Sequence, residues 1–112
     1  MSKRYFLVKT ISEKNLSREQ FEIALVASVR KLFGEFGLAR IRPKVVRFDE
    51  TSYEAIVACN REGAEDLQAA IGLISSISEA TVIVMTIRIS GTIKGLKEGK
   101  VFDSQKKENR WG

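Results

Sequence analysis

Histidine is absent from this chain, and cysteine, proline and tryptophan each occur once. Without an imidazole, histidine-based acid–base catalysis, histidine-activated nucleophiles and zinc sites with a histidine ligand are excluded. The one cysteine, Cys59, cannot form an internal disulfide, and its apolar surroundings in the sequence predict a buried, inert thiol. An enzyme built from this sequence would therefore need carboxylates with a divalent metal, or a reactive lysine.

Long apolar runs are also missing. The longest lies at about residues 81–89, far short of the roughly 20 apolar residues that a membrane-spanning helix needs. At the amino terminus, Lys3 and Arg4 lead directly into a strand-like run rather than into the apolar core of a signal peptide. We therefore expect a cytoplasmic protein with no membrane partner.

Basic residues outnumber acidic ones, with 19 Lys and Arg against 14 Asp and Glu and a formal net charge of +5. This excess favours a polyanionic partner, and nucleic acid is the leading candidate. At 112 residues and 44% apolar composition, the chain has material for one modest core. We expect a single domain over residues 1–97 and a charged, flexible tail at 98–112, which has too few apolar groups to offset chain entropy.

The first half of the sequence predicts a strand followed by a long helix. Residues 4–11 are rich in aromatic and β-branched types, which favour a strand. Ser17 stands three residues before Gln20, the spacing of a capping box, so the helix should begin there. Its apolar positions recur every three or four residues, at Phe21, Leu25, Ser28/Val29, Leu32 and Phe36. Gly37 is expected to end it in a left-handed conformation.

The second half predicts a hairpin, a helix and a strand. Pro43 lacks an N–H and disfavours helix at the residue before it, so residues 38–44 should be extended or loop. Apolar segments between polar turns then predict strands at Val45–Phe48 and Tyr53–Cys59, a helix at about Ala64–Ser76 and a strand at Thr81–Ile89. A short helix should begin near Ser90 or Gly91.

The resulting order, β-α-β-β-α-β, is the split βαβ arrangement of ferredoxin-like and RNA-recognition folds. The fold class is therefore α+β, an antiparallel sheet with two main helices and a short C-terminal helix. In the last strand Ile83, Met85, Ile87 and Ile89 share one parity and should face the core. The other parity should form an outer face that turns polar towards Arg88.

The base-stacking signature of many RNA-recognition domains is missing. That signature places aromatic residues along the third strand, whereas residues 53–59 here hold one aromatic residue, Tyr53, at the strand edge. Tyr5 and Phe6 are interpreted as core or partner-facing residues. RNA binding, if present, should therefore rely on phosphate contacts.

Two basic segments are the candidates for such contacts. The first holds four cations within eight residues, and Arg40, Arg42 and Lys44 would line one edge if the segment were extended. The predicted RNA-binding residues are Arg40, Arg42, Lys44, Arg47, Arg88, Lys94 and Lys97, with Lys100 beyond them. A solvated basic loop is an equally good reading of each segment, because a short Arg/Lys run is a weak signal.

Protein-borne catalysis finds little support. The adjacent acids Asp49-Glu50 and Glu65-Asp66 do not predict carboxylates converging on two metals from separate elements. Lys9, between Val8 and Thr10, is the one lysine in an apolar run, and one residue is not a site. We expect no catalytic residue, no metal site and no cofactor on the protein.

Several segments resemble the archaeal ribonuclease P protein component 2 family. Residues 84–94 lead from a Val-, Ile- and Arg-rich strand into Ser-Gly-Thr-Ile-Lys, which is similar to the end of the family's core. Residues 55–62 and 67–74 are similar to its Cys-containing strand and its Ala- and Leu-rich helix. The likeness extends over about residues 4–96. Ala58 departs from the pattern, because relatives usually have a basic residue there.

The resemblance implies a protein subunit of the ribonucleoprotein that removes the 5′ leader of precursor tRNA, with Mg²⁺-dependent catalysis by the RNA. It implies as partners the ribonuclease P RNA, protein component 3, other protein subunits and, indirectly, precursor tRNA; self-association is a further expectation. The alternatives from the residues themselves are a ferredoxin-like regulatory or oligomerisation module with no RNA role, and a stand-alone acidic-site nuclease.

Overall fold

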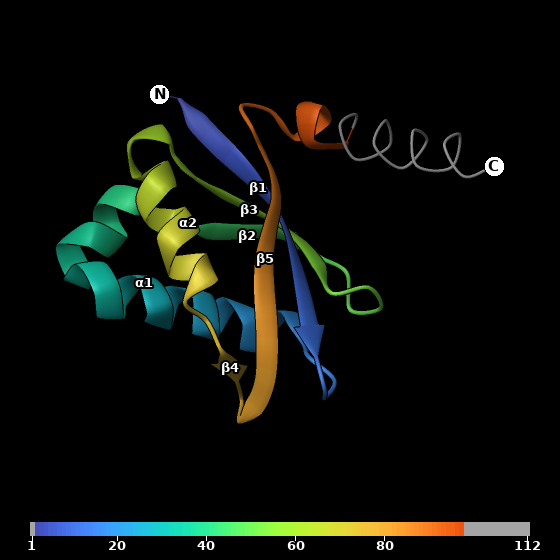
Figure 1. Cartoon of the computed structure of the whole chain (residues 1–112). Coiled ribbons are helices and arrows are strands. Elements are labelled where there is room, and N and C mark those ends of the chain that lie inside the picture. Colours follow the sequence, from blue (N-terminus) through green and yellow to red (C-terminus); the bar gives the residue numbers. More distant parts are fainter. Residues whose placement is uncertain (1, 98–112) are drawn as a thin grey trace.

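Five strands form one antiparallel sheet in the computed structural model, which describes residues 2–97 (Figure 1). The elements in chain order are β1 Lys3–Ser12, α1 Arg18–Ile41, β2 Lys44–Phe48, β3 Glu54–Asn60, the 3₁₀ turn η1 Arg61–Gly63, α2 Ala64–Gly72, β4 Ser76–Ile77 and β5 Ala80–Ser90. Residues 93–97 are helical as well. The expected tail at 98–112, with Lys100, lies outside the described residues.

The sheet order is β2-β3-β1-β5-β4, so the first strand lies between the third and the last. This arrangement confirms the split βαβ fold and the α+β class. The β2–β3 hairpin is antiparallel as predicted. Strand β4, a two-residue edge strand that pairs with the start of β5, was not predicted from the sequence.

The start of α1 follows the predicted capping box. The Ser17 hydroxyl accepts a hydrogen bond from the Gln20 N–H at 3.1 Å, and the Gln20 side chain accepts one from the Ser17 N–H at 3.0 Å. Two backbone donors that the helix leaves unpaired are satisfied in this way.

The end of α1 differs from the prediction. Gly37 does not cap the helix; Gly34 has φ 71° and ψ −173° and interrupts it, and the helical path then continues to Ile41. Because this break turns the helix, Phe36 leaves the apolar stripe and is 92% exposed. The left-handed cap is Arg42, at φ 51°. The expectation that residues 38–44 are extended was therefore wrong for 38–41, and Pro43 acts only at the residue before it.

The second helix is shorter than predicted, ending at Gly72 rather than Ser76. Before it, Gly63 packs against α1 so closely that a Cβ would lie 2.7 Å from the Ile41 Cγ1. This contact fixes where η1 meets the end of α1, beside the basic segment.

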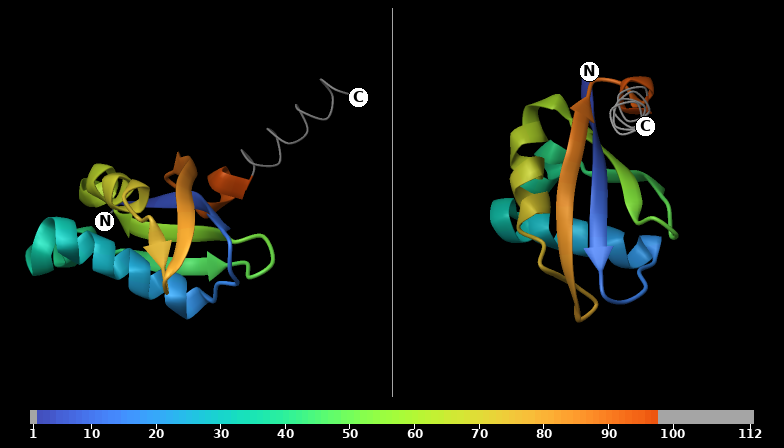
Figure 2. Two further views of the ribbon diagram at one scale, coloured as in Figure 1. Left: turned by 60° about the horizontal axis from the view of Figure 1, so that its bottom comes forward. Right: turned by 45° about the vertical axis from the view of Figure 1, so that its right-hand side comes forward.

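Helices α1 and α2 cover one face of the sheet, and residues 93–97 lie over the other (Figure 2). The helix-covered face holds the main core. Its fully buried members include Phe6, Val8, Phe21, Leu25, Val29, Ile41, Val57, Cys59, Leu67 and Ile71. We call the opposite face the open face. There Leu96 packs on Leu7 and Ile56 in a second, small cluster, with Tyr5 beside it.

The predicted core face of β5 was wrong. Val82 and Val84 are buried, whereas Ile83 is 57% exposed and Met85 is 37% exposed. Both parities are apolar, so the pattern did not say which one the helices cover. A bulge also shifts the register of β5 between Thr86 and Arg88. As a result Arg88 pairs with Leu7 of the open face, while Ile89, still 39% exposed, pairs with the core residue Phe6.

Candidate nucleic-acid interface

Basic side chains from two strands, β2 and β5, lie on the open face of the sheet. Directly paired residues of an antiparallel ladder point to the same side. Lys44 pairs with Ala58, Arg47 pairs with Ile56, and Arg88 pairs with Leu7. Three of the predicted RNA-binding residues therefore share one face, although they come from separate parts of the sequence.

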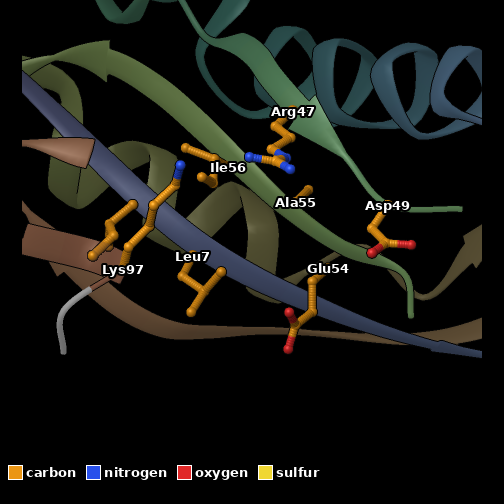
Figure 3. A pocket seen from close by; sticks show the side chains of 8 residues that line it. Leu7, Arg47, Asp49, Glu54, Ala55, Ile56 and Lys97 are labelled. Atoms are coloured by element: carbon orange, nitrogen blue, oxygen red, sulfur yellow. The ribbon is translucent and has the colours of Figure 1, made fainter. Parts of the chain in front are cut away.

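Residues 93–97 add two further cations to this face. Lys94 and Lys97 are both exposed there. Lys97 and Arg47 line one hollow of about 170 Å³, together with Leu7, Ile56 and Leu96 (Figure 3). Figure 3 shows the ends of the Lys97 and Arg47 side chains on either side of Ile56. We call Lys44, Arg47, Arg88, Lys94 and Lys97 the basic half of the open face.

Two carboxylates also line the Arg47–Lys97 hollow, Asp49 and Glu54. Asp49 accepts backbone hydrogen bonds from Thr51 at 2.8 Å and Ser52 at 3.2 Å, and these bonds lower the pKa of its carboxyl. Asp49 thus closes the β2–β3 turn. The hollow has mixed charge, so it does not favour an anion over other ligands.

Arg40 does not join the other predicted residues. It lies in α1, and its guanidinium forms an ion pair with Asp66 of α2 at 2.7 Å. The Asn60 side chain donates to the Arg40 carbonyl at 2.9 Å. The hypothesis that Arg40, Arg42 and Lys44 line one extended edge is therefore wrong. Helical, left-handed and strand conformations follow one another there.

Lys3 is a basic residue that sequence reasoning missed. It lines a larger hollow, of about 490 Å³, with Arg42 and Lys44. The predicted topology could have indicated its position, because a split βαβ fold places the first strand beside the third. Lys3 of β1 pairs with Asn60 at the end of β3, and Lys44 of β2 pairs with Ala58 from the other side of β3.

The described residues show no arrangement for metal chemistry. Within residues 2–97, no group of three or more His, Cys, Asp or Glu side chains is placed to hold a metal ion. The Lys9 ammonium donates to the Ser52 carbonyl, so it helps to hold the β2–β3 turn. Cys59 is buried as predicted, and burial raises the pKa of its thiol to about 11.

The other end of the open face is apolar. Ile11 pairs with Ile83, Lys9 pairs with Met85, and all three apolar side chains are at least one-third exposed. We call Ile11, Ile83 and Met85 the apolar strip. Large apolar side chains that are exposed next to one another are typical of surfaces that bind another protein. None of the described helices is long and apolar enough to span a lipid bilayer.

A protein-family model described as the Rpp14/Pop5 family matches residues 4–100. The chain belongs to the Rpp14/Pop5 family. Ribonuclease P protein component 2 of Pyrococcus furiosus is 34% identical over 95 residues, covering 85% of this chain and 79% of that protein. The protein of the same name from Aeropyrum pernix is 38% identical over 76 residues, covering 68% of this chain and 62% of that protein.

A chain in the cryo-EM structure of yeast ribonuclease MRP has the same fold. It matches with a TM-score of 0.67 at 13% identity, covering 99% of this chain and 96% of that chain. The family resemblance inferred from the sequence is thus confirmed. Membership in the Rpp14/Pop5 family makes this chain a ribonuclease P subunit, part of a ribonucleoprotein with other subunits.

Proposed function

We propose that this ribonuclease P subunit binds and stabilises the catalytic RNA through the basic half of the open face, and contributes no catalytic group to removal of the 5′ leader from precursor tRNA. The observation that carries the proposal is the family match over residues 4–100. That span includes every residue of the basic half. It favours the ribonucleoprotein over a regulatory module that shares the fold.

Phosphate contact is the mode of binding that the side chains support. Strands β2 and β5 and the helical residues 93–97 present Lys and Arg on one face, and no base-stacking aromatic row accompanies them. Arg and Lys neutralise phosphates without reading sequence, and they fix the position of the protein on the RNA. Mg²⁺-dependent hydrolysis would then belong to the RNA, with the protein lowering the repulsion between its phosphates.

The apolar strip supports a protein partner beside the RNA. We assign it to ribonuclease P protein component 3, with self-association as the competing use of the same surface. Other protein subunits would contact the RNA elsewhere, and precursor tRNA would meet this chain only indirectly. The proposed location is the cytoplasm, where a reduced Cys59 is stable.

Reconstitution tests this function. The catalytic RNA and protein subunits from the same genome are mixed with and without this chain, and 5′ leader removal is followed at limiting Mg²⁺. We expect the complete mixture to cleave faster than the mixture without the chain, and the chain alone to show no cleavage at any Mg²⁺ concentration.

Two outcomes would contradict the proposal. Equal rates with and without the chain would remove its role in the complex. Cleavage by the chain alone, lost in Asp49→Ala, would place a nuclease site on the protein. Asp49→Asn is the matched control, since its amide oxygen still accepts the turn N–H groups.

A further inference from the structure

The hollow of about 490 Å³ lies between α1, the start of β1 and the start of β2. It is lined by Lys3, Val26, Leu38, Arg42, Pro43 and Lys44. Its volume falls in the range of about 300–1,000 Å³ that small-ligand sites occupy. We call it the cationic hollow, because three of its six lining residues are cations and none is acidic.

The three cations are not paired with a carboxylate in the described part of the chain. Among residues 2–97, Lys3, Arg42 and Lys44 form no ion pair, whereas Arg18, Arg30 and Arg40 each pair with a carboxylate. The Arg47–Lys97 hollow, in contrast, includes Asp49 and Glu54. Of these two hollows, the cationic hollow is therefore the one where an anion meets positive charge alone.

The backbone around the hollow is held in place before any ligand binds. The Arg42 N–H donates to the Leu38 carbonyl at 2.9 Å, which closes the helix end, and the ring of Pro43 fixes the next φ angle. Lys44 is tied into the sheet by its pairing with Ala58. Such preorganisation lowers the entropic cost of binding.

The apolar side chains decide which anion fits. A free phosphate would leave the apolar residues Val26, Leu38 and Pro43 uncovered. The backbone of a paired RNA helix is convex, so it would pass over the opening of the hollow without entering it. A single unpaired nucleotide has both parts: a phosphate for the cations, and a base with an apolar face. The guanidinium of Arg42 is also a planar group on which a base can stack.

We propose that the cationic hollow seats one bulged or looped-out nucleotide of RNA, with its phosphate among Lys3, Arg42 and Lys44. This inference rests on the proposed RNA-binding function and adds a shape requirement to it. Paired RNA contacts the open face through phosphates; the hollow accepts the nucleotide that leaves the helix.

The test compares three hairpin RNAs whose stems are equally long. The first is fully paired, the second has a single bulged nucleotide, and the third has an abasic residue at the bulge. The intact protein should bind the bulged hairpin about 10-fold more tightly than the paired one, and the abasic hairpin should lose most of that preference. The abasic RNA keeps the phosphate, so it separates base seating from charge.

Two variants locate the effect. Val26→Trp fills the hollow without a change of charge and should abolish the preference while leaving affinity for the paired hairpin unchanged. Lys3→Gln/Lys44→Gln should weaken binding of the bulged hairpin more than the control Lys14→Gln/Lys31→Gln, which removes equal charge from exposed sites elsewhere. Circular dichroism checks folding, and Val26→Phe replaces the tryptophan variant if that one unfolds.

Equal binding of all three hairpins by the intact protein overturns the inference, as does a folded Val26 variant that keeps the preference. Binding to the ribonuclease P RNA transcript is measured in parallel. Failure of the intact protein to bind that transcript counts against the proposed function. If the Val26 variant binds the transcript as tightly as the intact protein does, the result counts only against the proposal that the hollow holds a nucleotide.

Discussion

The two ends of the open face differ although they belong to the same two strands. At one end Leu7 is buried beneath Leu96, and cations surround the covered patch. At the other end Ile11 pairs with Ile83, and both remain more than half exposed. The helical residues 93–97 reach only the first end. Within residues 2–97, the cover that the chain supplies for this face thus ends where the apolar strip begins.

This difference shows how one sheet face can carry two kinds of contact. Apolar side chains under the chain's own helical turn stabilise the fold, and the basic residues around them stay available to RNA. Apolar side chains without such cover are available for a protein partner. The bulge in β5 lies between the two ends and places Arg88 rather than an isoleucine beside Leu7.

The largest expected effect separates the ends by stability. Leu96→Ala should lower the free energy of unfolding by about 2 kcal/mol, because it uncovers Leu7 and Ile56 and removes a buried side chain. Ile83→Ala should change it by less than about 0.5 kcal/mol, because that side chain is already in solvent. Urea denaturation of both variants measures the contrast. Equal losses would show that the two ends are covered alike.

The second effect concerns partner binding at the apolar strip. Ile83→Asp/Met85→Asp should weaken binding to component 3 by about 30-fold or more, the loss expected when central apolar contacts are removed. Ile23→Asp/Leu73→Asp, which alters apolar residues outside the strip that are more exposed than Ile83 and Met85, serves as the control. Titration by isothermal calorimetry measures both. An equal loss in the control pair would mean that the strip has no special role.

The third effect concerns salt dependence at the basic half. Arg47→Gln/Lys97→Gln should lower the slope of log affinity against log salt by roughly 0.7 to 0.9 per lost phosphate contact. Arg40→Gln should lower it by less than one contact, because Asp66 already neutralises that guanidinium. Filter binding to the ribonuclease P RNA over a range of salt concentrations gives the slopes. The order of the two effects reverses if the α1–α2 side faces the RNA.

The smallest effect lies in the main core on the other face of the sheet, at Cys59. Burial raises the pKa of this thiol from 9.0 to about 11, with Lys3 and Arg4 opposing the shift. The folded chain therefore holds the thiol proton more tightly than the unfolded chain does. The resulting stability is fully present below about pH 9 and is lost as the pH rises towards 11. Urea denaturation of the parent and Cys59→Ala over this interval should show the decline in the parent alone.

Local signals in the sequence predicted what local geometry determines. The capping box at Ser17 and the β2–β3 hairpin depend on neighbours a few residues away, and both are present. The inert thiol of Cys59 followed from an apolar strand. The order of the predicted elements, β-α-β-β-α-β, predicted the split βαβ topology, and the sheet order agrees with it.

Two of the failures share one physical cause, because they depended on contacts between distant segments, whereas the third is local to the end of α1. Which set of alternate β5 residues faces the helices depends on the pairing register between β5 and β1. It also depends on a bulge that the residues of β5 do not predict. The meeting of Lys97 with Arg47 depends on where residues 93–97 pack. The left-handed conformation fell on Arg42 rather than Gly37, because Gly34 had already redirected the helix.

The backbone conformation at Gly34 restricts which residues position 34 can tolerate. A Cβ built there meets no atom within 4 Å, so the position has room for a side chain, yet its φ of 71° and ψ of −173° lie in a region that L-residues avoid. In a saturation-mutagenesis scan, small and large replacements should therefore be depleted to a similar degree, unlike at a packed glycine such as Gly63, where depletion should rise with side-chain volume. The mirror image of these angles is ordinary extended backbone, so D-alanine introduced by chemical synthesis should be accepted where L-alanine is not.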